Sequence, residues 1–183
     1  LIKLIKKLTH NKILWNYQVF CGSYLPSWRK TNYTISSSSK KKYGGGVLLD
    51  LSHEIDYSRL IIGDFNISNL IFKKISNLKI ETEDFLLASG TYKKTHIHIS
   101  LNYFSRFNLR QIIIDGKGIS ICADLNSNKA IIFINGKKYN YKSKKTIERT
   151  YYDMHKSILN DRNCSACSYK DALKTQKIIE NFL

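Results

Sequence analysis

A glycine-rich turn followed by a carboxylate and an imidazole is the segment of this sequence best suited to chemistry. Gly44, Gly45 and Gly46 precede a run in which Asp50 and His53 are three residues apart. Residues three apart share one face of a helix, and a carboxylate beside an imidazole can hold a general acid or base in one tautomer near neutral pH. The spacing alone favours the alternative, a helix that begins with an acid and carries a surface histidine. Both interpretations stay open on spacing alone.

Other polar and aromatic side chains could bind a ligand near this segment. Trp28, Arg29 and Tyr33 could line a sugar pocket by stacking and hydrogen bonding, or they could anchor a loop. Lys42 ends a run of three lysines beside the glycines, where it could meet a phosphate or a pyrophosphate. A run of like charges is, however, commonly solvated. These four residues are candidate substrate contacts.

The loops that bind nucleotide phosphates are missing from the sequence. No G-x-x-x-x-G-K-[ST] occurs, and the G-x-G at Gly116 and Gly118 lies between two strand-like runs. It therefore predicts a hairpin turn, since a dinucleotide fingerprint needs a strand before it and a helix after it. The chain contains no Rossmann site of its own.

Four cysteines in a chain of this length do not predict a disulfide framework. Cys21 and Cys122 fall in strand-like runs, and we expect both to behave as small apolar residues. Cys164 and Cys167 form a single C-x-x-C without a second pair or a nearby histidine, so we predict no metal site. This usage favours a reducing, cytoplasmic compartment.

The elements that must position these side chains follow from periodicity. We expect helices near 1–11, 47–62, 147–160 and 168–182, and strands at 13–20, 67–75, 78–89, 92–103, 109–115, 118–124 and 129–134. Between the first strand and the second helix, 22–46 lacks periodicity and predicts a long loop, which is typical of a functional segment. This order is not an alternation of strands and helices, so it predicts an α+β fold.

One predicted strand alternates clearly between two faces. Apolar or small residues occupy one face, and polar residues occupy the other: Thr95, Ile97, Ile99, Leu101 and Tyr103 against His96, His98, Ser100 and Asn102. The polar face can meet solvent, a ligand or a partner. The two histidines are therefore candidates for a ligand site, with a solvated or interface face as the alternative.

Composition sets the class of protein. With 183 residues, 43% hydrophobic and 12% aromatic, the chain can form one domain with a core and is not intrinsically disordered. No apolar run approaches the roughly 20 residues that cross a bilayer. The net charge of +16 invites a nucleic-acid partner, but only six of the 30 basic residues are Arg. Nine basic residues and no acid precede Asp50, which favours one locally basic face.

The segment GGGVLLDLSHEIDYSRLIIG, at 44–63, resembles the signature of the C-terminal domain in the Gfo/Idh/MocA family of NAD(P)-dependent oxidoreductases. The stretches 21–28, 110–119 and 151–183 resemble that family's loop, strand–turn–strand and closing helix pair. The loop is similar to that of a branch found with surface-sugar and sialic-acid-like biosynthesis. The resemblance covers residues 1–183 as a single substrate and oligomerisation domain, without the family's N-terminal Rossmann domain.

The resemblance implies an open, mainly antiparallel sheet with helices on one face, and subunit contacts in a homo-oligomer through the exposed face. It implies that His53 moves a proton at a sugar hydroxyl while hydride passes to NAD or NADP, with Asp50 orienting it. Gly45 and Gly46 would lie beside the cofactor, which a domain outside this chain would mainly bind. Many family members place the histidine four residues after the aspartate, whereas here the spacing is three.

The substrate implied is a sugar or nucleotide sugar, and the chain alone should be inactive. Two alternatives from other classes remain. One is a basic nucleic-acid-binding module, and the other is a non-catalytic interaction protein that keeps the oxidoreductase fold.

Overall fold

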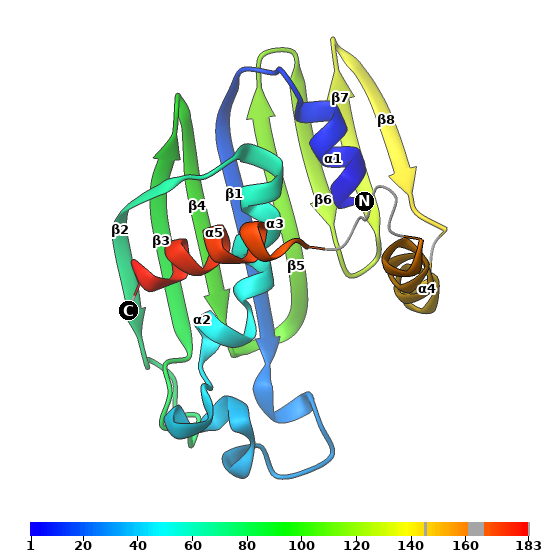
Figure 1. Cartoon of the computed structure of the whole chain (residues 1–183). Coiled ribbons are helices and arrows are strands. Elements are labelled where there is room, and N and C mark those ends of the chain that lie inside the picture. The colour runs from blue at the N-terminus through cyan, green and yellow to red at the C-terminus, as the bar shows by residue number, and fades with distance from the viewer. Residues whose placement is uncertain (145, 161–166, 183) are drawn as a thin grey trace.

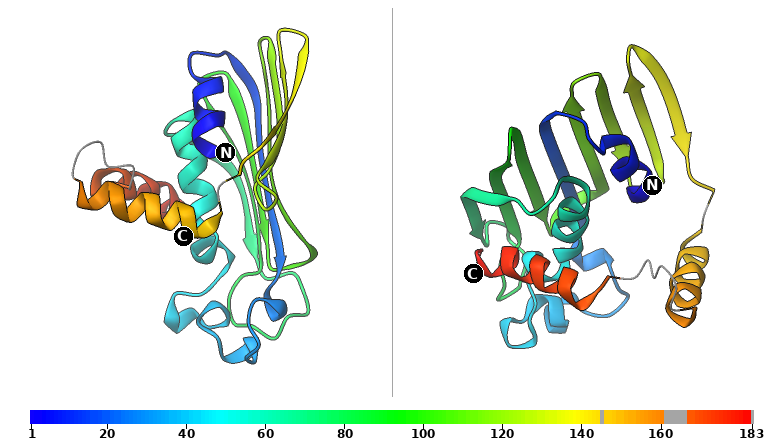
Figure 2. Two further views of the ribbon diagram at one scale, coloured as in Figure 1. Left: turned by 90° about the vertical axis from the view of Figure 1, so that its right-hand side faces the viewer. Right: turned by 45° about the horizontal axis from the view of Figure 1, so that its top comes forward.

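The computed structural model describes residues 1–144, 146–160 and 167–182, and they form one sheet with helices on one of its faces (Figures 1 and 2). The sheet has eight strands in the order β2-β3-β4-β1-β5-β6-β7-β8. Their bounds are β1 Leu14–Tyr24, β2 Asn66–Lys73, β3 Phe85–Tyr92, β4 Thr95–Asn102, β5 Phe104–Gly116, β6 Ile119–Asp124, β7 Lys129–Ile134 and β8 Lys137–Lys142. In the edge-on view of Figure 2 the opposite face of the sheet carries no helix.

The first strand lies in the middle of the sheet. β1 pairs in parallel with β4, where Asn16 is opposite His96, and antiparallel with β5, where Val19 is opposite Ile112. The remaining neighbouring strands are antiparallel. The predicted α+β fold with an open, mainly antiparallel sheet is confirmed.

Two helices that contact each other lie on the inner face: α3 (Ser52–Ile62) covers its centre, and α1 (Ile2–Thr9) lies beside α3 toward β6 and β7 (Figure 1). Ile5 of α1 and Ile55 of α3 are fully buried. They belong to the same core as the inward-facing residues of the central strands, which include Tyr17, Ile97, Ile99, Ile112 and Ile114. The amphipathic first helix therefore packs on the core of its own domain.

The last helix, α5 (Tyr169–Glu180), is held on α3 by a buried arginine. The Nε of Arg59 donates to Thr175 Oγ1 at 3.0 Å, and the Thr175 hydroxyl donates to Asp56 at 2.6 Å. The Arg59 guanidinium also lies 3.6 Å from Asp171. Ser168 caps α5, since its side chain accepts from the backbone N–H of Asp171. By contrast, α4 (Ile147–Leu159) contains no buried residue.

The region from 22 to 62 differs from the prediction in two ways. The single predicted helix is two helices, α2 (Val47–Asp50) and α3, because Leu51 leaves the helical region with φ −103° and ψ 18°. The expected structureless loop contains four short 3₁₀ turns: η1 Leu25–Ser27, η2 Tyr33–Ile35, η3 Ser37–Ser39 and η4 Lys41–Tyr43.

Two strand predictions were wrong. Residues 78–84 are not part of a strand, because the buried Asp84 carboxylate accepts hydrogen bonds from the backbone N–H groups of Ile75 and Ser76 and folds this segment into a loop. The strand begins only at Phe85. The lysine-rich run 137–142, in which no strand was expected, forms β8 at the edge of the sheet, a position that charged side chains suit.

The two faces of β4 are arranged largely as predicted. Its alternating apolar residues are buried, and His96 is exposed on the other face. Asn102 is a correction, because its side chain is buried and accepts from the backbone N–H groups of Phe104 and Ser105.

Of the two cysteines in strands, Cys21 is buried as expected, whereas Cys122 is exposed on the helix-free face. In the described part of the chain, every helix is too short or too polar to span a membrane.

Candidate functional site

His53 lies in the first turn of α3 and contacts the residue that follows it. Its Nε2 is 2.9 Å from Oε1 of Glu54, and its side chain is 51% exposed. Glu54 is fully buried. Within the described residues, no hydrogen bond or ion pair joins His53 to Asp50. The carboxylate that orients the imidazole is therefore Glu54.

Arg110 of β5 compensates the buried charge of Glu54. Both Nε and Nη2 of Arg110 lie 2.6 Å from Oε1 of Glu54, and Arg110 is 31% exposed. The other oxygen of Glu54 accepts a hydrogen bond from the hydroxyl of Tyr57. A buried carboxylate is stable when it is paired and fully hydrogen-bonded, and these contacts meet both conditions.

Burial in this region, together with the charge of Glu54, raises the pKa values of the neighbouring Tyr57 phenol and Cys21 thiol. Burial, together with the charge of Glu54, raises the pKa of Tyr57 far above its usual range, so Tyr57 remains a donor. Burial raises the pKa of the Cys21 thiol to about 12, with a further contribution from Glu54. The hydroxyl of Tyr17 donates to Ser58, whose hydroxyl in turn donates to the backbone carbonyl of Glu54.

Asp50 belongs to a second cluster, at the end of α2. Its carboxylate accepts a 2.6 Å hydrogen bond from the hydroxyl of Tyr103, which follows β4. Burial, then the hydrogen bond to Asp50, raises the pKa of Tyr103 and keeps the phenol protonated. Trp28 packs edge-on against Tyr103 with ring centroids 5.3 Å apart, and its indole N–H donates to Ser23.

Gly46 is enclosed by the protein itself. It has φ 120°, in the region that favours glycine, and a Cβ there would overlap the carboxylate of Glu83. A Cβ on Gly45 would overlap the backbone carbonyls of Ser37 and Ser38. Internal packing thus accounts for both glycines, and their backbone N–H groups donate within the protein, to the carbonyls of Lys40 and Ser38.

The predicted substrate contacts are only partly brought together. Trp28, Arg29 and Tyr33 line one cavity under the 3₁₀ turns, but its volume of about 10 Å³ has room for about one water molecule and not for a sugar. The Tyr33 hydroxyl accepts from the backbone N–H of Lys79, which makes Tyr33 a loop anchor as well. Lys42 is exposed, with its ammonium 4.7 Å above the ring of Tyr43.

No metal cluster of three or more His, Cys, Asp or Glu side chains occurs in the part of the chain that the structure describes. Cys164 lies outside the described residues, and Cys167 is exposed. The C-x-x-C prediction therefore stays untested.

Comparison with known proteins gives a match at the level of structure. No protein-family model matches the sequence, and no curated protein matches it. Levoglucosan dehydrogenase, solved with NADH and levoglucosan, superposes with a TM-score of 0.79 at 15% identity, over 98% of this chain and 59% of that one. An oxidoreductase from Agrobacterium radiobacter, solved with NAD+, L-tartaric acid and magnesium, gives 0.75 at 17% identity, over 98% and 57%.

A third solved structure agrees with these two. UDP-N-acetylglucosamine 3-dehydrogenase from Acidithiobacillus ferrooxidans gives a TM-score of 0.70 at 12% identity, over 98% of this chain and 55% of that one. This chain has the fold of the C-terminal part of such dehydrogenases. It spans little more than half of their length.

Sequence reasoning missed Glu54 and Tyr103 as members of the site, and Arg110 was noted only as part of a resemblance. A signal for Glu54 was available. It lies three residues after Leu51 and four before Ser58, on the buried side of α3, where an acid requires a basic partner. No sequence pattern indicates that this partner is Arg110 on β5.

Proposed function

We propose that this chain is the C-terminal domain of a Gfo/Idh/MocA-type oxidoreductase that transfers hydride between NAD or NADP and a sugar or nucleotide sugar. The observation that carries the proposal is a half-exposed histidine held by a buried, arginine-paired carboxylate, directly after the glycine-rich turn. Its support from the comparisons is the fold, shared with dehydrogenases whose solved complexes contain NAD+ or NADH.

In this proposal His53 is the acid/base. Because Nε2 lies 2.9 Å from the Glu54 carboxylate, we assign the ring proton to Nε2, so that Nδ1 keeps its lone pair and can accept the proton of a sugar hydroxyl. The Glu54 charge then stabilises the imidazolium that results. Asp50 accepts from Tyr103 and has no hydrogen bond or ion pair with His53 in the described structure, so we assign Asp50 to the wall of the site.

The dinucleotide supplies hydride acceptance, and the residues that would hold it belong to a domain outside this chain. The glycines at 45 and 46 would shape the turn rather than bind the cofactor, because protein atoms already fill the space beside them. This chain contributes the proton transfer and the walls of the substrate site.

We further propose that the helix-free face of the sheet associates with a second copy. It exposes several large apolar side chains, which are Ile71, Leu87, Ile113, Ile131 and Phe133. A cavity of about 350 Å³ on the same face is lined in part by His98 and Ser100. In this arrangement the histidines of β4 face a subunit interface rather than a substrate.

The test begins with the coding sequence upstream of this chain, which should encode a strand–GxGxxG–helix unit. In the product that spans both parts, His53→Ala should lower turnover about 10²–10⁴-fold, the usual contribution of a positioned acid/base. His96→Ala is the matched control on β4 and should leave turnover unchanged. Full activity of His53→Ala would overturn the catalytic assignment. Micromolar NAD(H) binding by the 183-residue chain alone would contradict the division of labour.

A further inference from the structure

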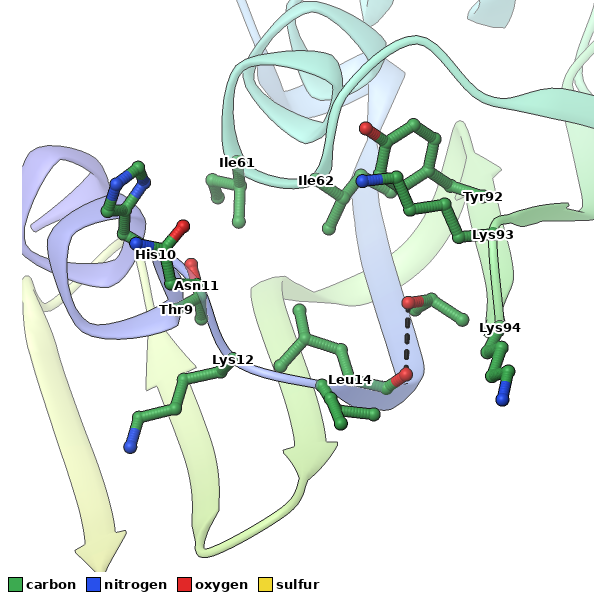
Figure 3. A pocket seen from close by; sticks show the side chains of 12 residues that line it. Thr9, His10, Asn11, Lys12, Leu14, Ile61, Ile62, Tyr92, Lys93 and Lys94 are labelled. Carbon is green, nitrogen blue, oxygen red and sulfur yellow. Dashed lines mark hydrogen bonds between the residues drawn. The ribbon is translucent and has the colours of Figure 1, made fainter.

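A large cavity lies at the opposite end of α3 from His53. It has a volume of about 620 Å³ and is formed by the α1–β1 connection, the end of α3 and the β3–β4 hairpin (Figure 3). Ile62, in its wall, is nine residues after His53, which corresponds to about 13 Å along a helix. The cavity is therefore separate from the candidate acid/base site.

The cavity is basic. Its lining includes Lys12, Lys93, Lys94 and His10, and none of its lining residues is acidic. Within the described residues, no ion pair joins these lysines to a carboxylate. Figure 3 places Lys12 and Lys94 on opposite sides of the cavity. The ammonium of Lys93 points toward Ile62, whereas those of Lys12 and Lys94 point away from the middle of the cavity (Figure 3). Lysines from two separate segments therefore surround the rim of one concave surface.

The remaining wall is apolar. Ile61, Ile62, Tyr92 and Leu14 contribute to it, and Ile13 at its edge is 54% exposed. The two sides are fixed relative to each other, because the hydroxyl of Thr95 donates to the backbone carbonyl of Leu14 at 3.1 Å (Figure 3). The cavity is preformed and amphipathic, and its volume lies within the usual range for small-molecule sites.

The hairpin turn gives an independent reason to assign a role to its lysines. Tyr92 pairs with Thr95, so Lys93 and Lys94 are the two turn residues, and Lys93 has φ 54°. Glycine, asparagine or aspartate is favoured at such positions, and a lysine there is strained. The ammonium of Lys93 also lies 5.3 Å above the Tyr92 ring, on the cavity side. Turn formation alone does not account for the lysine at position 93.

We propose that this cavity binds a small organic anion that combines an apolar body with one phosphate or carboxylate group. The anionic group contacts the ammonium of Lys93, the flexible side chains of Lys12 and Lys94 add positive charge at the rim, and the apolar body covers Ile13 and the side chains behind it. Inorganic phosphate alone would leave the apolar wall in water, and a neutral body would leave the lysines unpaired. The proposal does not depend on the oxidoreductase assignment.

The experiment is an amide NMR titration of the 183-residue chain with phenyl phosphate, with benzoate, with inorganic phosphate and with benzyl alcohol. For phenyl phosphate we expect a Kd of about 1 mM, given its small number of atoms. Signals of residues 9–14 and 92–95 should shift. Inorganic phosphate and benzyl alcohol should each bind at least about fivefold more weakly than phenyl phosphate. Inorganic phosphate keeps only the contact with the lysines, and benzyl alcohol keeps only the contact with the apolar wall. The tighter of phenyl phosphate and benzoate identifies the anionic group.

Variants separate this site from general attraction to a basic chain. The double variant Lys12→Gln/Lys93→Gln should weaken phenyl phosphate binding about fivefold, since each exposed charge contact contributes modestly. Lys138→Gln is the matched control, because Lys138 also lies over an aromatic ring, that of Phe133 at 5.9 Å, but on β8. It should bind like the unmodified chain.

Unchanged binding by the double variant would overturn the proposal. So would equal shifts with inorganic phosphate, which would indicate a site for charge alone, or shifts confined to other parts of the chain. The exposed positions of Lys12 and Lys93 mean that neither substitution should unfold the protein.

Discussion

The imidazole Nε2 of His53 lies 2.9 Å from Oε1 of Glu54, its neighbour in sequence. Consecutive residues of a helix usually point in different directions. Here one side chain is half-exposed and the other fully buried, and they meet at the boundary between solvent and core. The contact links a surface imidazole to Arg110 of β5 through one buried carboxylate.

Removal of Glu54 should destabilise the chain strongly. Glu54→Ala leaves Arg110 and Tyr57 without their partner, and we expect it to lower the free energy of unfolding by about 3 kcal/mol, the range for breaking a buried pair. Denaturant unfolding followed by circular dichroism measures this change. Arg110→Ala should cost a similar amount, because it leaves a fully buried carboxylate. If the double variant cost the sum of both, the two residues would not be coupled and the paired assignment would fail.

The glycine-rich turn offers a matched pair of substitutions. Gly44→Ala places its Cβ in open space but at φ 70°, so it should cost about 1 kcal/mol. Gly46→Ala should cost about 3 kcal/mol, because φ 120° and ψ 153° lie in a region essentially restricted to glycine and the added Cβ also meets the carboxylate of Glu83. Thermal unfolding of both variants measures the difference. Equal costs would mean that the backbone at Gly46 relaxes, and its conformation would not account for this glycine.

Glu83 should make stability depend on pH. Burial raises the pKa of Glu83, so the folded chain holds this proton more tightly than the unfolded chain. Ionisation of Glu83 therefore lowers the free energy of unfolding. The full loss is present above the pKa of Glu83 in the folded chain, and no loss is present below its pKa in the unfolded chain. Glu83→Gln should raise the melting temperature at pH 7 and have little effect near pH 3.

A control of opposite sign is available at Asp124. The hydroxyl of Ser127 donates to Asp124 and lowers the pKa of its carboxyl. The stabilisation by ionised Asp124 is present above the pKa of Asp124 in the unfolded chain, and it is lost as the pH falls through the pKa of Asp124 in the folded chain. Asp124→Asn should therefore lower the melting temperature at pH 7, with a smaller effect in acid. The same sign for both variants would contradict these assignments.

Cysteine alkylation tests burial and the proposed sheet-face association together. Cys21 has a pKa of about 12, so at pH 8 only about one thiol in ten thousand is ionised, and it is buried. Iodoacetamide should modify Cys122 in the native protein and Cys21 only after unfolding, as peptide mass spectrometry would detect. Cys122 is opposite Ile113 and Ile131 on the helix-free face. Its modification should slow as protein concentration rises, and a rate independent of concentration would contradict association through this face.

Local patterns predicted most of the elements, and the errors have identifiable causes. The alternation along 95–101 was correct because one face of that strand is buried. The interval 78–84 alternates only at Leu78 and Ile80, and the inward-facing Asp84 accepts from the backbone N–H groups of Ile75 and Ser76, which closes the preceding chain into a loop. A side chain that replaces a backbone partner leaves no periodic signal.

The position of the candidate site in the chain could be predicted from the sequence, but the pairs of side chains that interact in it could not. The histidine and the glycine-rich turn are adjacent in sequence, so their proximity follows from local structure. Glu54 pairs with Arg110, and Asp50 with Tyr103, across the packing of helices on strands. Helical spacing favoured Asp50 as the partner of His53, but the break at Leu51 changed the geometry. Such pairings depend on the tertiary fold.

The central position of β1 has a consequence for the order of folding. β4 and β5 are separated by a single residue, yet they do not pair, because β1 lies between them. The hairpins on either side, β2–β4 and β5–β8, can form from local contacts, whereas β1 must wait for partners such as His96 and Gly116 that are synthesised much later. Insertion of the first strand is then the step that joins two half-sheets, and substitutions at Tyr17 or Val19 should slow folding more than equally destabilising ones in β7.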